Sequence, residues 1–307
     1  MKIYINRRPV DGPWGGGSKV LAAIVKECID RNHQVFFEEE IRRLIDIDVY
    51  FCMDPRPKET SVYEELLNRR YKNNSSRLVH RIGDLGTHGK PELYQLIKSV
   101  IGFADLVIFP SIWAENYAKF ENIKRSIVIQ NAPNQIFIEN KRNCIIKDEL
   151  RIVTHHWSNN DLKGFDFYER LDEYCLKHQK VKFSFIGRKP DSVVFQNYVP
   201  PLDMPGLVNE IPKHNLYLTA SRQEAGANHV LEAMALGLPV MYHKDGGSIV
   251  EYCKDFGIEF ESFEGLIDII ENKIDVVRDI TSKTSITRGI REMAKEYVDS
   301  FEAIREN

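Results

Sequence analysis

The chain has 307 residues, which is long enough for two hydrophobic cores because single cores stop growing near about 250–300 residues. Its composition, 43% hydrophobic and 28% charged, is typical of a folded globular protein and excludes global disorder. The net charge of −3 offers no electrostatic basis for nucleic-acid binding, which requires a basic surface. We therefore expect two globular domains and no nucleic-acid partner.

Cysteine use and the amino-terminal residues indicate the compartment. The five cysteines are widely spaced and form no Cys-x-x-Cys pair, which predicts reduced thiols and argues against a zinc site. The first residues, MKIYINRRPV, lack the apolar run of a secretory signal, and no stretch approaches the roughly 20 apolar residues of a membrane span. We expect a cytoplasmic protein whose membrane contact, where it occurs, is peripheral and at the inner face.

In the first part of the chain, short runs of β-branched and aromatic residues alternate with segments of helical period. Expected strands lie at 2–6, 34–37, 48–53, 77–82, 105–110 and 126–130. A helix over 18–31 follows the glycine run Gly15, Gly16 and Gly17, so a strand, a glycine-rich turn and a helix open the protein. Alternation of this kind predicts a parallel sheet wound with helices.

A polar, irregular stretch over 131–149 is typical of a connection between domains. Beyond it a second alternating series follows, with strands at 151–155, 181–186, 216–220 and 239–243, and helices from Gly164 and over 228–236. We expect a first domain over 1–140, a second over 150–285 and a terminal helix within 286–307. Ligands bind at the carboxyl ends of parallel strands, so the site is expected in a cleft between the two domains.

The most informative segment is 221–240, which reads SRQEAGANHVLEAMALGLPV. It predicts a loop, a helix with its N-cap at Asn228, a stop at Gly237 and a strand after Pro239. The unpaired N–H groups at such a helix start suit a diphosphate. Glu224 precedes the helix and Glu232 lies in its early turns, so one carboxylate can reach a ligand beside the amides while the other lies deeper. Carboxylates accept the paired hydroxyl hydrogen bonds that a ribose or a hexose offers.

Two glutamates separated by seven residues, followed by Glu-Ala-Met-Ala-x-Gly-x-Pro-Val, resemble the signature of retaining glycosyltransferases of family four, which have the GT-B fold. The resemblance implies an α/β protein of two doubly wound parallel-sheet, Rossmann-like domains that face each other across a cleft, with the last helix packing back on the first domain. It also implies roles for the two carboxylates: Glu224 contacts the donor sugar and Glu232 the nucleotide ribose. The backbone that would approach the diphosphate or the sugar is that of Gly226, Ala227 and Asn228.

Other fragments resemble the family in the same chain order. Lys163-Gly164 resembles the pair whose amine holds the donor phosphates, and the strand that ends at Gly187 resembles the one that follows it. The strand containing His80 resembles one that ends in a histidine, and the resemblance makes His80 a catalytic candidate beside Glu224 and Lys163. The first glycine-rich loop of the family corresponds to Gly15, Gly16 and Gly17, which are donor-binding candidates.

One departure concerns the charges that hold the diphosphate. The family often has an arginine five residues before the lysine, and Ser158 stands there in this chain. Arg188, directly after Gly187, is a candidate replacement, because a diphosphate leaving group needs about two cations or equivalent amides. His155 and His156 end a strand, where alternation sends only one of them toward the cleft.

The resemblance implies transfer of a sugar from a nucleotide diphosphate sugar to a glycan, lipid or other hydroxyl acceptor, with retention at the anomeric carbon, as in polysaccharide biosynthesis. Neither a metal nor a cofactor other than the donor substrate is expected. Two alternatives stay open: a nucleotide-sugar epimerase of the same fold, and a catalytically inactive nucleotide-sugar-binding protein. Taken singly, Glu224 and Lys163 read as surface charges and His80 as a core histidine, so only their combination favours a site.

Overall fold

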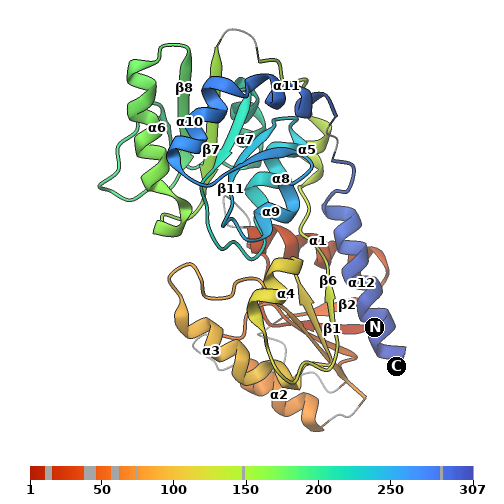
Figure 1. The fold of residues 1–307 in the computed structure, drawn as a ribbon. Helices are drawn as coiled ribbons and strands as arrows, with labels where there is room; N and C mark the ends of the chain where they lie inside the picture. The colour runs from red at the N-terminus through yellow and green to blue at the C-terminus, as the bar shows by residue number, and fades with distance from the viewer. Residues whose placement is uncertain are drawn as a thin grey trace. The chain divides into compact units, whose positions relative to one another are not determined.

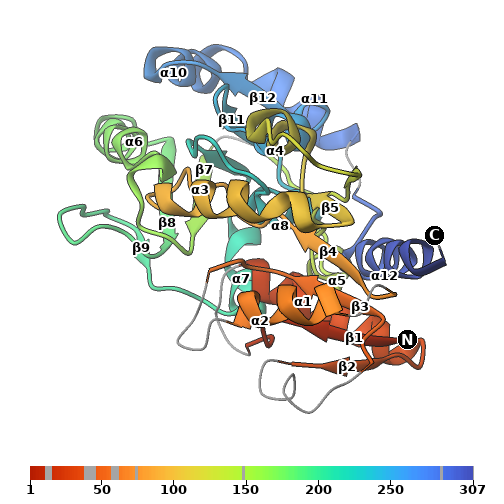
Figure 2. The same cartoon turned by 90° about the horizontal axis from the view of Figure 1, so that it is seen from below.

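A computed structural model of the chain describes residues 1–10, 16–37, 46–56, 62–72, 75–146, 149–283 and 286–306. Within these ranges the strands form two sheets of six parallel strands each (Figures 1 and 2). The chain divides into two compact units: Met1–Asn131 together with Ile290–Asn307, and Ala132–Gly289. The first unit is therefore discontinuous in sequence, and the second is contiguous.

The sheet of the first unit has the strand order β2-β1-β3-β4-β5-β6. Its strands are β1 (Lys2–Ile5), β2 (Gln34–Phe36), β3 (Val49–Cys52), β4 (Arg77–Arg81), β5 (Leu106–Phe109) and β6 (Ser126–Val128). The connecting helices are α1 (Gly16–Asp30), α2 (Val62–Lys72), α3 (Pro91–Val100) with the short turn η2 (Ile101–Phe103), and α4 (Ile112–Ala118). Every residue of β3 and β5 is buried, which is typical of parallel strands covered on both faces.

The last helix, α12 (Ile290–Glu306), belongs to the first unit and lies beside α1 (Figure 1). Its aromatic rings pack on β3: the ring centroid of Phe301 is 4.9 Å from that of Phe51. At the surface, the Arg31 guanidinium bonds the Asp299 carboxylate at 2.6 Å. The helix thus completes the core of the first unit.

The second unit has the strand order β12-β11-β10-β7-β8-β9. Its strands are β7 (Leu150–His156), β8 (Val181–Gly187), β9 (Tyr198–Val199), β10 (Leu216–Thr219), β11 (Val240–His243) and β12 (Gly257–Phe260). Its helices are α5 (Gln135–Glu139), α6 (Phe165–Lys177), α7 (Met204–Glu210), α8 (Asn228–Ala235), α9 (Ser248–Cys253), α10 (Phe263–Asn272) and α11 (Ile274–Lys283), with the short turns η3 (Asp161–Lys163) and η4 (Ile211–Lys213).

Side chains of the second sheet alternate between two hydrophobic layers, as the two-residue period of a strand requires. Tyr217 in β10 packs in one cluster with residues of α7, α8 and α9. Its neighbours Leu216 and Leu218 pack in the other cluster, with residues of α6, α10 and α11. Helices therefore cover both faces, and the predicted fold class of two doubly wound parallel α/β sheets is confirmed.

The observed strands match the expected ones to within about two residues, while β9 and β12 were not predicted. Both lie at the edges of the second sheet, where strands are short or partly exposed and give weak sequence signals. In the described part of the chain, no helix is both long enough and apolar enough to cross a membrane.

Candidate functional site

The strand order of the second unit reverses between β7 and β10, which pair in parallel through Leu216 with Ile152 and Tyr217 with Val153. The helices that follow these two strands, α6 and α8, pack on opposite faces of the sheet, and open α/β sheets bind ligands beyond the carboxyl ends of the strands at such points. The segment after β7 leads to Lys163, and the segment after β10 leads to Glu224 and α8. We call the group Lys163, Glu224, Glu232 and the first turn of α8 the switch-point site.

Lys163 is placed by a tight turn, η3, that begins three residues after Ser158. The Asn160 side chain caps this turn by accepting a hydrogen bond from the Leu162 N–H at 3.0 Å. Gly164 ends the turn with φ of +83°, and a Cβ at that position would lie 2.5 Å from both the Cβ and the carbonyl oxygen of Ala220. Only glycine fits here, and its close approach holds Lys163 against the end of β10.

Glu224 is placed by the loop that follows β10. The preceding residue, Gln223, has a left-handed φ of 53°, and its N–H donates to the Asp245 carbonyl at 2.8 Å. Glu224 itself forms an isolated parallel bridge with Gly247. Backbone hydrogen bonds join this loop to the segment after β11, and they fix the position of the backbone from which the Glu224 side chain extends.

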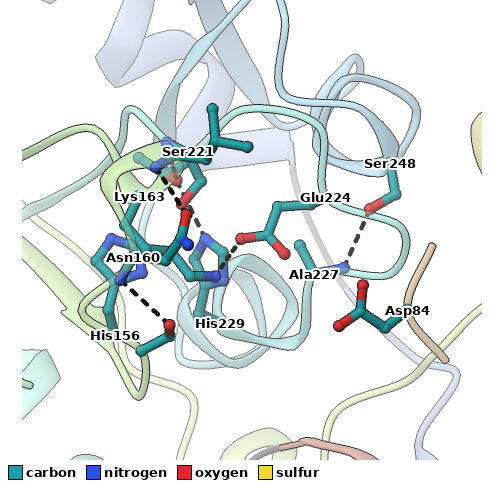
Figure 3. Close-up of polar contacts among 12 residues, drawn as sticks. Asp84, His156, Asn160, Lys163, Ser221, Glu224, Ala227, His229 and Ser248 are labelled. Atoms are coloured by element: carbon teal, nitrogen blue, oxygen red, sulfur yellow. Dashed lines mark hydrogen bonds and ion pairs between the residues drawn. The ribbon is translucent and has the colours of Figure 1, made fainter. Parts of the chain in front are cut away.

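Lys163 and Glu224 form an ion pair between the Lys163 ammonium and Oε1 of Glu224 (Figure 3). The side chains are only 12% and 13% exposed, so solvent screens this pair less than it screens a surface salt bridge. The structure thus brings together the two residues that the sequence singled out as catalytic candidates in this unit. The pair places a cation and an anion side by side at the switch point.

Helix α8 begins beside this pair at Asn228, the expected first residue, but its N-cap lies one residue earlier than predicted. The predicted N-cap was Asn228, but the cap residue is Ala227, and no side chain caps the helix. The Ala227 N–H donates to the Ser248 hydroxyl at 3.0 Å, so this amide has its acceptor within the protein (Figure 3). The first-turn N–H groups of an uncapped helix are suited to an external anionic acceptor. Gly226 and Asn228 flank the cap residue, one on each side.

Glu232 lies deeper, in the second turn of α8, and its side chain is 6% exposed. Its Oε2 is 3.0 Å from Nε2 of His155, the penultimate residue of β7. Nδ1 of the same ring is 3.0 Å from the Tyr217 hydroxyl. His155 therefore faces α8, whereas the next residue, His156, bonds the Tyr168 hydroxyl of α6 at 2.8 Å. Both rings also lie near that of His229 in α8, with centroids 6.2 and 4.9 Å away, so the expectation that only one of the two histidines faces the cleft stays a prediction.

His229, the second residue of α8, fills the space between the ion pair and the sheet. Its Nε2 is 3.1 Å from the Thr219 hydroxyl, and its ring centroid is 4.9 Å from that of His156. Burial lowers the pKa of His229 to about 3, with Glu224 raising it and Lys163 lowering it as smaller influences. The imidazole is therefore neutral near pH 7, and the charges of this site are those of Lys163 and the carboxylates.

Gly187 and Arg188 stand at the carboxyl end of β8, the strand next to β7. Gly187 has φ of +122°, and a Cβ there would lie 1.9 Å from the His156 carbonyl oxygen, so the position requires glycine. Arg188 places its guanidinium carbon 3.9 Å from the ring centroid of Trp157, a cation–π contact. Arg188 is thus held at the same edge of the sheet as Lys163, stacked on the residue that follows β7.

The remaining predicted residues lie in the first unit. His80 is the fourth residue of β4 and has no exposed surface, and burial lowers its pKa to about 4. Gly16 and Gly17 are the first two residues of α1, and a Cβ at Gly17 would meet no atom within 4 Å. Gly15 lies outside the described residues. Their proposed roles stay predictions.

Sequence reasoning did not find three contacts that shape this site: the bond of His155 to Glu232, the place of His229 beside the ion pair, and the Ser248 hydroxyl that accepts from Ala227. The sequence could have indicated His229 as a site residue, because it directly follows Asn228, the predicted start of the helix. No local signal existed for the others, since 77 and 21 residues separate the partners in sequence. Among the residues that the structure describes, no group of three or more His, Cys, Asp or Glu side chains is placed to hold a metal ion.

Solved structures share the architecture over nearly the whole chain. A glycosyltransferase from Rickettsia africae superposes with a TM-score of 0.66 at 12% identity, covering 100% of this chain and 99% of that one. Anabaena HepE in complex with UDP-glucose gives 0.66 at 15% identity, with 100% and 98% covered. The catalytic domain of starch synthase IV from Arabidopsis thaliana, bound to ADP and acarbose, gives 0.68 at 12% identity, with 100% and 99% covered.

The chain has the GT-B fold. This chain has two doubly wound parallel units, and its last helix belongs to the first unit. At such low identities the likeness establishes the GT-B architecture and nothing finer. No family model matches the chain, and no curated protein matches it in sequence.

Proposed function

We propose that this GT-B protein is a retaining glycosyltransferase that uses a nucleotide diphosphate sugar as donor. The observation that carries the proposal is the buried pairing of Lys163 with Glu224 beside the uncapped start of α8, at the switch point of the second unit. The structures with the same architecture support it, because one is a glycosyltransferase and others hold UDP-glucose or ADP.

The chemistry assigns a distinct task to each group. In the donor complex, Lys163 leaves Glu224 and neutralises the diphosphate, together with the first N–H groups of α8 and the Arg188 guanidinium. Glu224 then accepts hydrogen bonds from hydroxyls of the sugar, and Glu232 accepts them from the ribose. The cations act most strongly as the bond between the anomeric carbon and the phosphate oxygen breaks, because negative charge grows on the leaving diphosphate.

Retention follows if the acceptor attacks from the face that the diphosphate leaves. The acceptor oxygen forms the new bond to the anomeric carbon, and its proton passes to an oxygen of the departing phosphate. In this scheme Glu224 orients the sugar and does not attack it, and no metal ion or further cofactor is required. The acceptor is a hydroxyl of a glycan or lipid, and His80 is the proposed catalytic residue of the first unit.

The decisive experiment measures nucleotide release and sugar transfer with a panel of UDP-, GDP-, ADP- and dTDP-sugars. Lys163→Met and Glu224→Gln should each lower turnover by about a hundredfold or more, the scale expected when a group that stabilises the transition state is lost. The matched control is Lys182→Met: Lys182 pairs with Glu149 at 2.5 Å, but at the amino-terminal end of the same sheet. Full activity of Lys163→Met would contradict the assignment.

One observation favours a second candidate, a nucleotide-sugar-binding protein without catalysis. Ser158 stands where the resemblance places an arginine, and its hydroxyl accepts from the Asn160 N–H at 3.3 Å, so it serves the turn and adds no charge. Under this alternative, donors bind and stabilise the fold, but neither transfer nor hydrolysis is detected. The same donor panel, read by thermal shift and by nucleotide release, separates the two.

A further inference from the structure

Three buried polar side chains form a continuous chain behind the switch-point site. Counted as whole residues, Tyr217, His155 and Glu232 are 0%, 7% and 4% exposed. The Tyr217 hydroxyl is 3.0 Å from Nδ1 of His155, and Nε2 of His155 is 3.0 Å from Oε2 of Glu232. Two of the three residues lie on adjacent paired strands, β7 and β10, so the sheet sets their spacing.

The direction of each hydrogen bond follows from the chemistry of its ends. An ionised carboxylate only accepts, so Nε2 of His155 must carry the proton that it donates to Glu232. In a neutral imidazole Nδ1 is then an acceptor, and the Tyr217 hydroxyl, which is 3.0 Å from Nδ1 and 3.3 Å from the His155 carbonyl oxygen, donates to it. Burial raises the pKa of Tyr217 well above its ordinary value, which keeps that proton in place. The His155 N–H donates in turn to the Tyr217 oxygen at 3.1 Å.

This arrangement fixes the Glu232 carboxylate. Glu232 enters the site from α8, and without a partner its side chain would have several rotamers to choose from. A carboxylate offers about four lone-pair positions, and the bond from His155 selects which way they point. Because both supporting residues stand on strands of the central sheet, the carboxylate is oriented before any ligand arrives.

We infer that His155, held by Tyr217, is a positioning residue that orients Glu232 to accept the ribose hydroxyls of the donor and so makes the site select ribonucleotides over 2′-deoxyribonucleotides. The inference rests on the proposed function, in which the nucleotide binds at this switch point. A buried acceptor that is oriented toward a hydroxyl rejects an analogue without that hydroxyl, because the acceptor is then left unpaired.

The test compares the binding of UDP, GDP and ADP with that of their 2′-deoxy forms, measured by titration calorimetry on the full chain. Whichever ribonucleotide binds the wild type should bind at least about tenfold tighter than its 2′-deoxy form, which is the scale of one hydrogen bond to a charged group. In His155→Leu the affinity for the ribonucleotide should fall about tenfold, while the affinity for the 2′-deoxy form should change less than about twofold. In His155→Gln, whose amide can still donate to Glu232, most of the preference should return.

The outcomes separate this inference from the function on which it rests. If only thymidine diphosphate or 2′-deoxy forms bind, or if His155→Leu weakens both forms equally, nucleotide binding survives and the positioning role of His155 is overturned. If the wild type binds no nucleoside diphosphate, both proposals fall. Tyr217→Phe supplies a second variant in case His155→Leu does not fold: it removes only the hydroxyl, and it should lower the ribose preference without abolishing binding.

Discussion

The Glu224 backbone is bridged in parallel to the Gly247 backbone. On one side of this bridge the Ser248 N–H donates to the Glu224 carbonyl at 2.8 Å. On the other side the Glu224 N–H donates to the Gly246 carbonyl at 3.2 Å. The residue that is proposed to orient the sugar is thus set by contacts of the main chain, and those contacts depend on a glycine.

Gly247→Ala should disturb the switch-point site and destabilise the second unit by about 3 kcal/mol or more, since Gly247 has φ of +70° and an added Cβ would lie 2.6 Å from the Glu224 carbonyl oxygen. Urea denaturation and nucleotide titration measure the two effects. Gly265→Ala is the control, because a Cβ there would meet only the Ser262 hydroxyl oxygen at 3.7 Å. Equal effects of the two substitutions would show that the close approach at Gly247 does not matter.

The ion pair predicts strong energetic coupling between Lys163 and Glu224 without any ligand. Lys163→Met and Glu224→Gln should each lower the free energy of unfolding by about 1–2 kcal/mol, because each leaves a mostly buried group without its partner. The double variant should lose about 1 kcal/mol less than the sum of the single variants. A double-mutant cycle from urea denaturation measures this coupling, and strict additivity would contradict the pairing.

Arg188 is expected to contribute to diphosphate affinity through a guanidinium held on Trp157. Arg188→Ala should weaken the binding of a nucleoside diphosphate about tenfold, with a smaller effect on the corresponding nucleoside, which lacks the phosphates. Arg188→Lys should recover only part of the affinity, because lysine keeps the charge but loses planar stacking. Calorimetric titration at low and high salt checks this, and an unchanged affinity in Arg188→Ala would remove Arg188 from the site.

His80 predicts a pH dependence of stability in the first unit. Burial lowers its pKa from 6.5 to about 4 in the folded state, so below pH 6.5 the unfolded chain binds a proton that the folded chain does not. Its contribution to stability is therefore complete above pH 6.5 and is lost as the pH falls toward 4.

Between pH 7.5 and pH 5 this loss amounts to about 2 kcal/mol. Denaturation at the two pH values measures the free energy of unfolding. Its decrease from pH 7.5 to pH 5 should be larger by that amount in the wild type than in His80→Gln. The same decrease in both proteins would mean that His80 does not titrate as a buried neutral histidine.

The elements of the fold that the sequence predicted are those with strong local signals. The buried strands β3 and β5 read as continuous apolar runs, and β10 does so up to Thr219. The helix α8 follows a loop and is followed by Gly237, whose φ of +93° ends it as expected. The pairing order of the strands has no such local signal, because β7 and β10 pair although their bonded residues are more than 60 positions apart in the sequence.

The site could be predicted as a set of residues but not as a network. The sequence places Glu224 in the loop before the helix and Glu232 in its early turns, and the turn at Gly164 indicates where Lys163 lies. The partner of each carboxylate depends on tertiary packing: Glu224 pairs with Lys163, and Glu232 bonds His155. The N-cap was misplaced by one residue: Asn228 is a residue type that often caps helices, but it is already the first residue of the helix, and the cap residue is Ala227, whose side chain has no acceptor.

The helix α12 closes the core of the first unit although the whole second unit precedes it in the sequence. The second unit is contiguous, so its residues have all been synthesised before α12 emerges. Phe51 in the first unit, by contrast, is covered by Phe301 only after α12 has been synthesised. We therefore expect the second unit to complete its fold during translation before the first unit does. A nascent chain released before α12 would expose the apolar surface of β3 and be a substrate for chaperones.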